Sequence, residues 1–105
     1  MKASIQNILL IEPQSSLRES VKLVLTTTGG FQVTALTCIP NDKPDTDVVL
    51  LPAILLPQFL SSILADLPFI LTTKGNTPAK GNYLGEVLIQ ELPLPAVAEK
   101  VRQLL

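Results

Sequence analysis

Histidine is absent from this 105-residue sequence, and cysteine occurs once, as Cys38. A single cysteine cannot form an internal disulfide, and without histidine it has neither the usual general base nor the usual metal co-ligand near it. We interpret Cys38 as a half-buried structural thiol. No pair of nucleophile and base is evident elsewhere, so the sequence predicts no enzyme, no catalytic residue, no cofactor and no metal site.

Charged side chains are also few. Eight Lys and Arg residues stand against nine Asp and Glu residues, which gives a net charge of -1 without a basic cluster. Because neutralisation of phosphates dominates affinity for nucleic acids, we expect no nucleic-acid partner. The same balance argues against attachment to an acidic membrane surface.

Long apolar runs are missing as well. The longest, residues 48–56, has nine residues, whereas a membrane-spanning helix needs about twenty. Residues 8–11 are too few for the apolar region of a signal peptide, and no small-residue cleavage site follows them. We therefore expect a cytoplasmic protein. Met1 at the start and a final helix that reaches Leu105 favour a complete small protein.

The sequence does contain enough apolar material for a core. Hydrophobic residues make up 47% of the chain, and the mean hydropathy is +0.41. A chain of this length forms one ordinary domain, which we place at residues 1–105. It is expected to fold without disulfides or metals.

The N-terminal third has the pattern of a strand followed by a helix. Residues 7–11 form a continuous apolar run, typical of a parallel strand that is covered on both faces. Ser15 or Ser16 is expected to cap the helix, with Glu19 as the capping-box partner. The glycine pair at residues 29–30 is expected to end it.

Two more strands are predicted in the middle of the chain. Residues 31–36 alternate and include β-branched side chains, which indicates a short edge strand and completes a βαβ unit. Residues 37–46 hold turn-forming residues without apolar periodicity, so they predict a loop in place of a second helix. Residues 48–51 indicate a buried central strand, cut off by Pro52, which cannot donate to a ladder.

The C-terminal half repeats the alternation. A short helix is predicted to begin at Pro57, and residues 69–72 predict a buried strand. Residues 74–85 are too broken by glycine and proline for a helix, residues 86–90 predict the last strand, and Pro95 opens a final helix. The apolar stripe of the short helix consists of Phe59, Leu60, Ile63, Leu64 and Leu67.

This order of elements resembles the receiver domain of bacterial two-component response regulators. The likeness covers nearly the whole chain, through residues 7–12, 47–51, 68–73, 87–90 and 96–105. It implies an α/β fold, a three-layer, doubly wound, flavodoxin-like and receiver-like arrangement around a five-stranded sheet in the order 2-1-3-4-5. The second and fourth helices would be reduced to loops.

The sequence departs from the family where receivers carry their chemistry, at the C-terminal ends of the strands. The Asp that accepts phosphate is replaced by Pro52. Of the acidic pair that helps to bind Mg²⁺, only Glu12 remains, because Pro13 takes the other position. The Lys that pairs with the phosphoryl group is replaced by Gln90, and Glu91 replaces the proline after it.

Two further positions have a counterpart in the family. Thr73 matches the Thr or Ser that contacts the phosphoryl group, and Val87 falls where receivers usually carry the switching aromatic residue. The dipeptide of Thr72 and Thr73 can equally be β-branched strand sequence, and Glu12 can equally be a solvated carboxylate at a strand end. We count Glu12, Pro13, Pro52, Thr73 and Gln90 as the positions of a degenerate receiver site.

The resemblance and the departures together indicate a pseudo-receiver that acts by binding another protein, a signalling partner or a second copy of itself. Loss of two helices is expected to leave strands such as residues 69–72 thinly covered, and exposed apolar surface marks association sites. Alternatively, the long loops fold over the sheet. The possible interface residues are Phe59, Leu60, Ile63, Tyr83 and Val87.

A second functional hypothesis is a sensor of a small ligand or an anion. It would use the crevice at the C-terminal ends of the strands, where open α/β sheets bind ligands. Residues 74–77 and 80–82 combine lysine, glycine and asparagine, and such loops can hold an anion with backbone amides. Their spacing matches no phosphate-binding loop, and flexible polar loops have the same composition.

Overall fold

The computed structural model describes residues 7–72, 83–87 and 93–105. The described chain contains five strands, three α-helices and one 3₁₀ turn. In chain order they are β1 (Asn7–Ile11), α1 (Ser15–Thr27), β2 (Gln32–Leu36), β3 (Val48–Pro52), the 3₁₀ turn η1 (Ala53–Leu55), α2 (Leu56–Leu60), β4 (Phe69–Thr72), β5 (Tyr83–Val87) and α3 (Leu94–Leu104).

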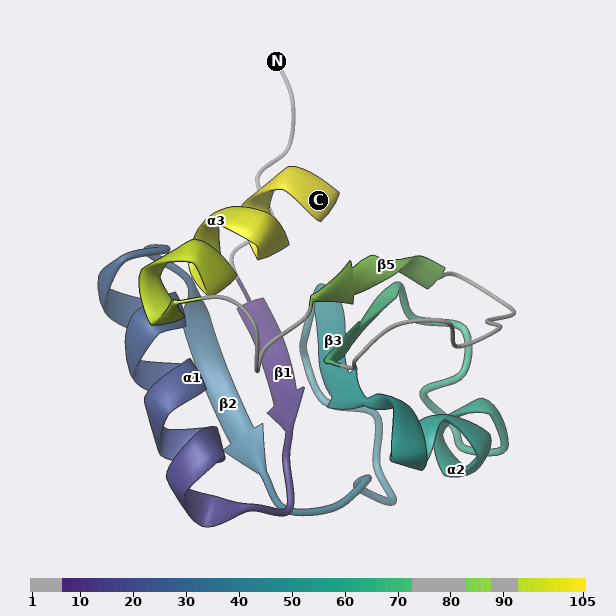
Figure 1. The fold of residues 1–105 in the computed structure, drawn as a ribbon. Coiled ribbons are helices and arrows are strands. Elements are labelled where there is room, and N and C mark those ends of the chain that lie inside the picture. The colour runs from purple at the N-terminus through teal and green to yellow at the C-terminus, as the bar shows by residue number, and fades with distance from the viewer. Residues whose placement is uncertain (1–6, 73–82, 88–92) are drawn as a thin grey trace.

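The five strands form one parallel sheet in the order β2-β1-β3-β4-β5. This confirms the predicted flavodoxin-like, receiver-like fold, and it shows that the last strand is parallel to its neighbour. Because all strands run the same way, their C-terminal ends lie at one edge of the sheet, as the arrowheads of β1 and β2 indicate (Figure 1).

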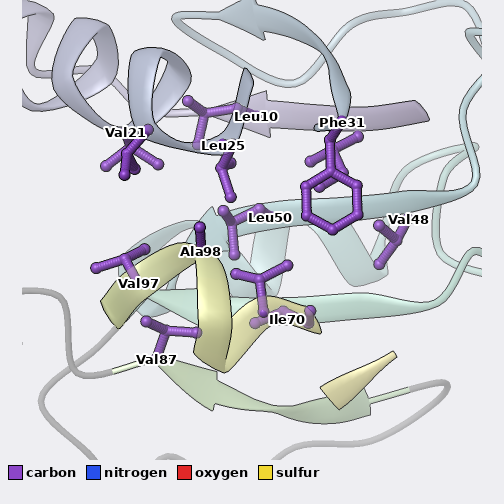
Figure 2. Packing of buried hydrophobic residues seen from close by; sticks show 13 residues of the cluster. Leu10, Val21, Leu25, Phe31, Val48, Leu50, Ile70, Val87, Val97 and Ala98 are labelled. Atoms are coloured by element: carbon purple, nitrogen blue, oxygen red, sulfur yellow. The ribbon is translucent and has the colours of Figure 1, made fainter. Parts of the chain in front are cut away.

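One face of the sheet packs against α1 and α3. From the strands, alternate residues such as Ile8, Leu10 and Leu50 point to this face, and all three are buried. Helix α1 contributes Val21, Val24 and Leu25, and α3 contributes Val97, Ala98 and Val101. In Figure 2, Leu10 and Leu50 from the strands meet Leu25 of α1 and Ala98 of α3 in the layer that holds most of the core.

The opposite face packs against α2 and the turns that follow it. The other set of alternating strand residues, which includes Leu9, Val49 and Leu51, points to this face. It forms a second hydrophobic cluster with Phe59 and Leu64. The rings of Phe59 and Phe69 lie with their centroids 4.9 Å apart in a tilted arrangement. Helical cover on both faces explains why β1, β3 and β4 are almost entirely apolar.

The connection between β2 and β3, residues 37–47, contains no helix, as predicted. Ile39 from this loop packs against the cluster on the α2 side of the sheet. Lys43 forms an ion pair of 2.8 Å with Asp66 in the turns after α2, and the hydrogen bond from Lys43 lowers the pKa of Asp66. Both ends of this pair are exposed, so it contributes little stability. The predicted loss of the fourth helix falls on residues outside the described ranges.

The expectation that β4 is thinly covered is wrong. Phe69, Ile70 and Leu71 are fully buried, and Thr72 is nearly so. Helix α3 covers one side of this strand, while Phe59 and its neighbours cover the other. The apolar residues of the α2 region therefore supply the cover that a longer helix would have given.

The beginning of α1 differs from the expected capping box. The helix already includes Ser15 and Ser16, its N-cap residue is Gln14, and no side chain of the cap residue bonds to the helix. The end is as predicted, because Gly30 adopts a left-handed φ of 73° and the Phe31 amide donates to the Leu25 carbonyl across the turn at 3.1 Å.

Two elements in the C-terminal half have other bounds than expected. Helix α2 ends at Leu60, before the apolar stripe is complete, because the Ser62 hydroxyl donates to the Phe59 carbonyl and accepts from the Leu64 amide. Such local bonds compete with the helix. Strand β5 begins at Tyr83 rather than Glu86, and a register shift opposite Phe69 and Ile70 accommodates the extra residue.

Within the described ranges, no helix is both long and apolar enough to cross a membrane.

Candidate functional site

The candidate site lies at the edge where the C-terminal ends of β1 and β3 meet. Leu10 pairs with Leu50 in a parallel ladder, so Glu12 and Pro52 lie at the same level, two residues farther along each chain. Two of the predicted degenerate positions are thereby brought together on neighbouring strand ends. Pro13 follows directly at the start of the turn that leads into α1.

Glu12 is built into that turn. Its side chain and backbone are only 8% exposed, so the alternative interpretation as a solvated carboxylate is wrong. The Glu12 amide donates to the Leu36 carbonyl at 2.9 Å, and its carboxylate Oε2 accepts the Gln14 amide at 3.1 Å. A carboxylate at the N-terminus of a helix also interacts favourably with the helix dipole. Glu12 thus stabilises the start of α1, the role that the sequence predicts for Ser15 or Ser16.

Arg18 completes the turn from inside α1. Its guanidinium Nη1 donates to the Glu12 carbonyl at 2.8 Å and to the Pro13 carbonyl at 3.3 Å. The Arg18 amide also donates to the Gln14 carbonyl at 2.9 Å. Sequence reasoning did not identify Arg18 as a site residue. The only sequence signal for this role is the position of Arg18, six residues after Glu12 and in the first turn of a helix.

Pro52 ends β3 and is partly exposed. It pairs with Thr72 at the end of β4, and the chain turns at once into η1. A proline ring offers neither a nucleophile for phosphate nor an oxygen ligand for a cation. The described residues include no group of three or more His, Cys, Asp or Glu side chains that could hold a metal ion.

The remaining predicted site positions are not all described. Thr73 and Gln90 lie outside the described residues, as do Lys74, Lys80 and the rest of the suggested anion-binding segments. Val87, expected at the position of the switching aromatic, is fully buried on the face covered by α3.

The burial of side chains excludes two of the residues that the sequence predicts for the interface. Phe59 and Val87 are fully buried and belong to the core: Phe59 points from α2 toward the sheet, and Val87 lies on the face that α3 covers. Leu60 and Tyr83 are half-buried, and Ile63 is 56% exposed. Sequence reasoning missed Ile54 in η1, which is 81% exposed. An interface at these exposed residues stays a prediction.

Tyr83 and Glu86 form a polar pair on the edge strand β5. Partial burial raises the pKa of Tyr83, and the negative charge of Glu86 and a hydrogen bond to its carboxylate raise it further. The ring of Tyr83 also lies 5.6 Å from that of Phe69. Within the described part of the chain, the buried Glu86 Oε2 has no hydrogen-bond partner.

Comparison with known proteins identifies the fold. No family model matches the sequence, and no curated protein matches it. The structure is similar to that of HP1043, an orphan response regulator of H. pylori, with a TM-score of 0.63 and 12% sequence identity, over 94% of this chain and 95% of that chain. The chain has a response-regulator-like receiver fold.

Receiver domains bind Mg²⁺ at this edge, and the residues present here do not fit that ion. Mg²⁺ requires near-octahedral oxygen ligands, with one or two carboxylates among them. Pro13 and Pro52 supply no carboxylate, one oxygen of Glu12 accepts the Gln14 amide, and two turn carbonyls already accept from Arg18. We therefore derive no chemical step through a metal at this site.

Proposed function

We propose that this chain is a non-phosphorylatable, receiver-like protein-interaction module in bacterial signal transduction. It binds a signalling protein or a second copy of itself and has no catalytic role. The observation that carries the proposal is the composition of the sheet edge, where Pro13 and Pro52 stand at the strand ends that carry acidic residues in receivers.

The proposed mechanism is docking without a phosphate-driven switch. Phosphorylation shifts a receiver between two populated states, and a chain that accepts no phosphoryl group lacks that input. Hydrogen bonds of the Glu12 carboxylate and of the Arg18 guanidinium hold the turn between β1 and α1 together. They support a single conformation of this edge of the sheet. Regulation then comes from the abundance of the partner or of the chain itself.

The surface that supports docking lies beside the same edge. Ile54 in η1 and Ile63 after α2 are exposed large aliphatic residues between β3 and β4. Half-buried Leu60 lies between them in the sequence. Exposed aliphatic side chains at the centre of an interface lose water on binding, and this favours association.

A substitution at Ile54 tests the docking surface. We expect Ile54→Asp to weaken self-association, or capture of a cognate signalling protein, by about tenfold or more, because a charge there is desolvated on binding. The change should leave the melting temperature nearly unaltered, since Ile54 is 81% exposed. Light scattering of the purified chain measures self-association, and binding of the cognate protein is measured by titration.

Leu23 supplies the matched control. It is 64% exposed on α1, which lies on the other face of the sheet. Leu23→Asp should leave association unchanged. Equal loss of binding in both variants, or unchanged binding in Ile54→Asp, would remove the η1 and α2 region from the proposed interface.

A further inference from the structure

The β1–α1 turn presents two backbone carbonyl oxygens to the same positive group. The carbonyls of Glu12 and Pro13 both accept from Nη1 of Arg18, at 2.8 Å and 3.3 Å. The contact with Glu12 is partly buried, and the contact with Pro13 is exposed. Arg18 is thus held against the strand end from the first turn of α1, although it lies six positions after Glu12 in the sequence.

The chemistry of these groups is that of a cation site. Carbonyl and carboxylate oxygens are the ligands that hard divalent cations prefer. A guanidinium is always protonated in proteins and is more weakly hydrated than an ammonium, so it can occupy such oxygens permanently. It also satisfies backbone carbonyls that would otherwise bond only to solvent or to an ion.

We propose that the Arg18 guanidinium acts as the fixed cation of this sheet edge. It occupies the turn oxygens of Glu12 and Pro13 and holds the β1–α1 turn in one conformation without a divalent ion. This inference rests on the proposed function, because it explains how a receiver edge without a metal keeps its shape. Arg18 is a positioning residue and takes no part in chemistry.

The test compares the response to Mn²⁺ of the full chain with that of Arg18→Ala. Removal of the guanidinium leaves the two carbonyl oxygens open to a hard cation beside the Glu12 carboxylate, whose Oε2 still accepts the Gln14 amide. We expect millimolar Mn²⁺ to raise the melting temperature of Arg18→Ala by about 4 °C and that of the unaltered chain by far less. Without Mn²⁺, Arg18→Ala should melt below the unaltered chain.

Lys22→Ala is the matched control. Lys22 is an exposed cation on the same helix, one turn further on, and its variant loses the same charge. It should respond to Mn²⁺ as the unaltered chain does. If Arg18→Ala does not fold, Arg18→Met keeps an unbranched side chain without a hydrogen-bond donor and serves in its place.

Two results would overturn the inference. One is an equal rise of the melting temperature in the unaltered chain and in the Arg18 variant, which means that the guanidinium excludes no cation. The other is no response in the Arg18 variant, which makes Arg18 an ordinary hydrogen-bond donor. Neither result depends on phosphorylation, so the proposed function stands or fails separately on whether acetyl phosphate adds mass to the chain.

Discussion

Pro13 and Pro52 change what the ends of β1 and β3 can do. A proline has no side-chain oxygen and no backbone N–H, so each of these positions lacks a possible ligand and a possible hydrogen-bond donor. Glu12, the acid that remains, accepts the Gln14 amide at the start of α1. At the scale of single residues, the edge supports the helix that follows, and under the proposed function it accepts no phosphoryl group.

Tyr83 gives a prediction about pH. It is the only tyrosine in the chain, so its ionisation can be followed by absorbance without interference. We expect its pKa to lie above the ordinary value of about 10, because partial burial and the neighbouring Glu86 both disfavour the anion. Below that ordinary value the resulting stability is fully present. As the pH rises further, the unfolded chain ionises first and the free energy of unfolding falls.

A substitution of Glu86 separates burial from the charge of Glu86 as causes of the raised pKa of Tyr83. In Glu86→Gln the pKa of Tyr83 should fall but stay above its ordinary value, since burial is the larger cause. A return to the ordinary value would assign the shift to the charge of Glu86 alone. An ordinary pKa in the unaltered chain would contradict the burial of this side of β5.

At the scale of elements, Arg102 joins α3 to the end of α1. Its guanidinium donates to the Gly29 carbonyl and lies 5.7 Å from the centroid of the Phe31 ring. A cation near the C-terminus of α1 also interacts favourably with the dipole of that helix. The guanidinium thereby joins α3 to the loop between α1 and β2 at one corner of the larger core.

We expect Arg102→Ala to lower the free energy of unfolding by about 1–2 kcal/mol, through loss of a charged hydrogen bond and a cation–π contact. Urea denaturation measures the change. Lys100→Ala removes the same charge two residues earlier on α3, and it should have a smaller effect. Equal effects of the two variants would show that net charge, rather than the contact with Gly29 and Phe31, stabilises the corner.

Most elements could be predicted because their sequence signals are local. The apolar runs of β1, β3 and β4 and the glycine pair after α1 follow directly from burial and backbone geometry. The sequence predicts the start of β5 at Glu86, three residues after its actual start at Tyr83, because Gly85 weakens the strand pattern. Gly85 adopts a φ of 147° where the Leu104 side chain approaches, and this close approach of α3 depends on the tertiary structure.

The site was predictable only in part, for similar reasons. Pro13 and Pro52 follow apolar strands directly, so their places at the sheet edge could be read from the sequence. The burial of Phe59 depends on its contact with Phe69 on another strand, and the role of Arg18 depends on the path of the turn. Neither contact has a signal in residue spacing alone.

At the scale of the whole molecule, a receiver-like parallel sheet carries Pro13 and Pro52 at the C-terminal ends of its strands. Both faces of the sheet are buried, one against α1 and α3 and the other against α2 and the turns that follow. The core includes Ile11 and Val87 at the ends of β1 and β5, whereas Pro13 is exposed and Pro52 is only partly buried. Under the proposed function, such less buried positions can differ from those of phosphorylatable receivers without loss of the fold.

The measurement that tests this account most directly is the intact mass of the chain after incubation with acetyl phosphate and Mg²⁺. A phosphorylatable receiver with its strand-end Asp, treated in parallel, is the positive control. We predict no covalent change, because Pro52 offers no carboxylate to form an acyl phosphate. A mass increase of one phosphoryl group would contradict the account.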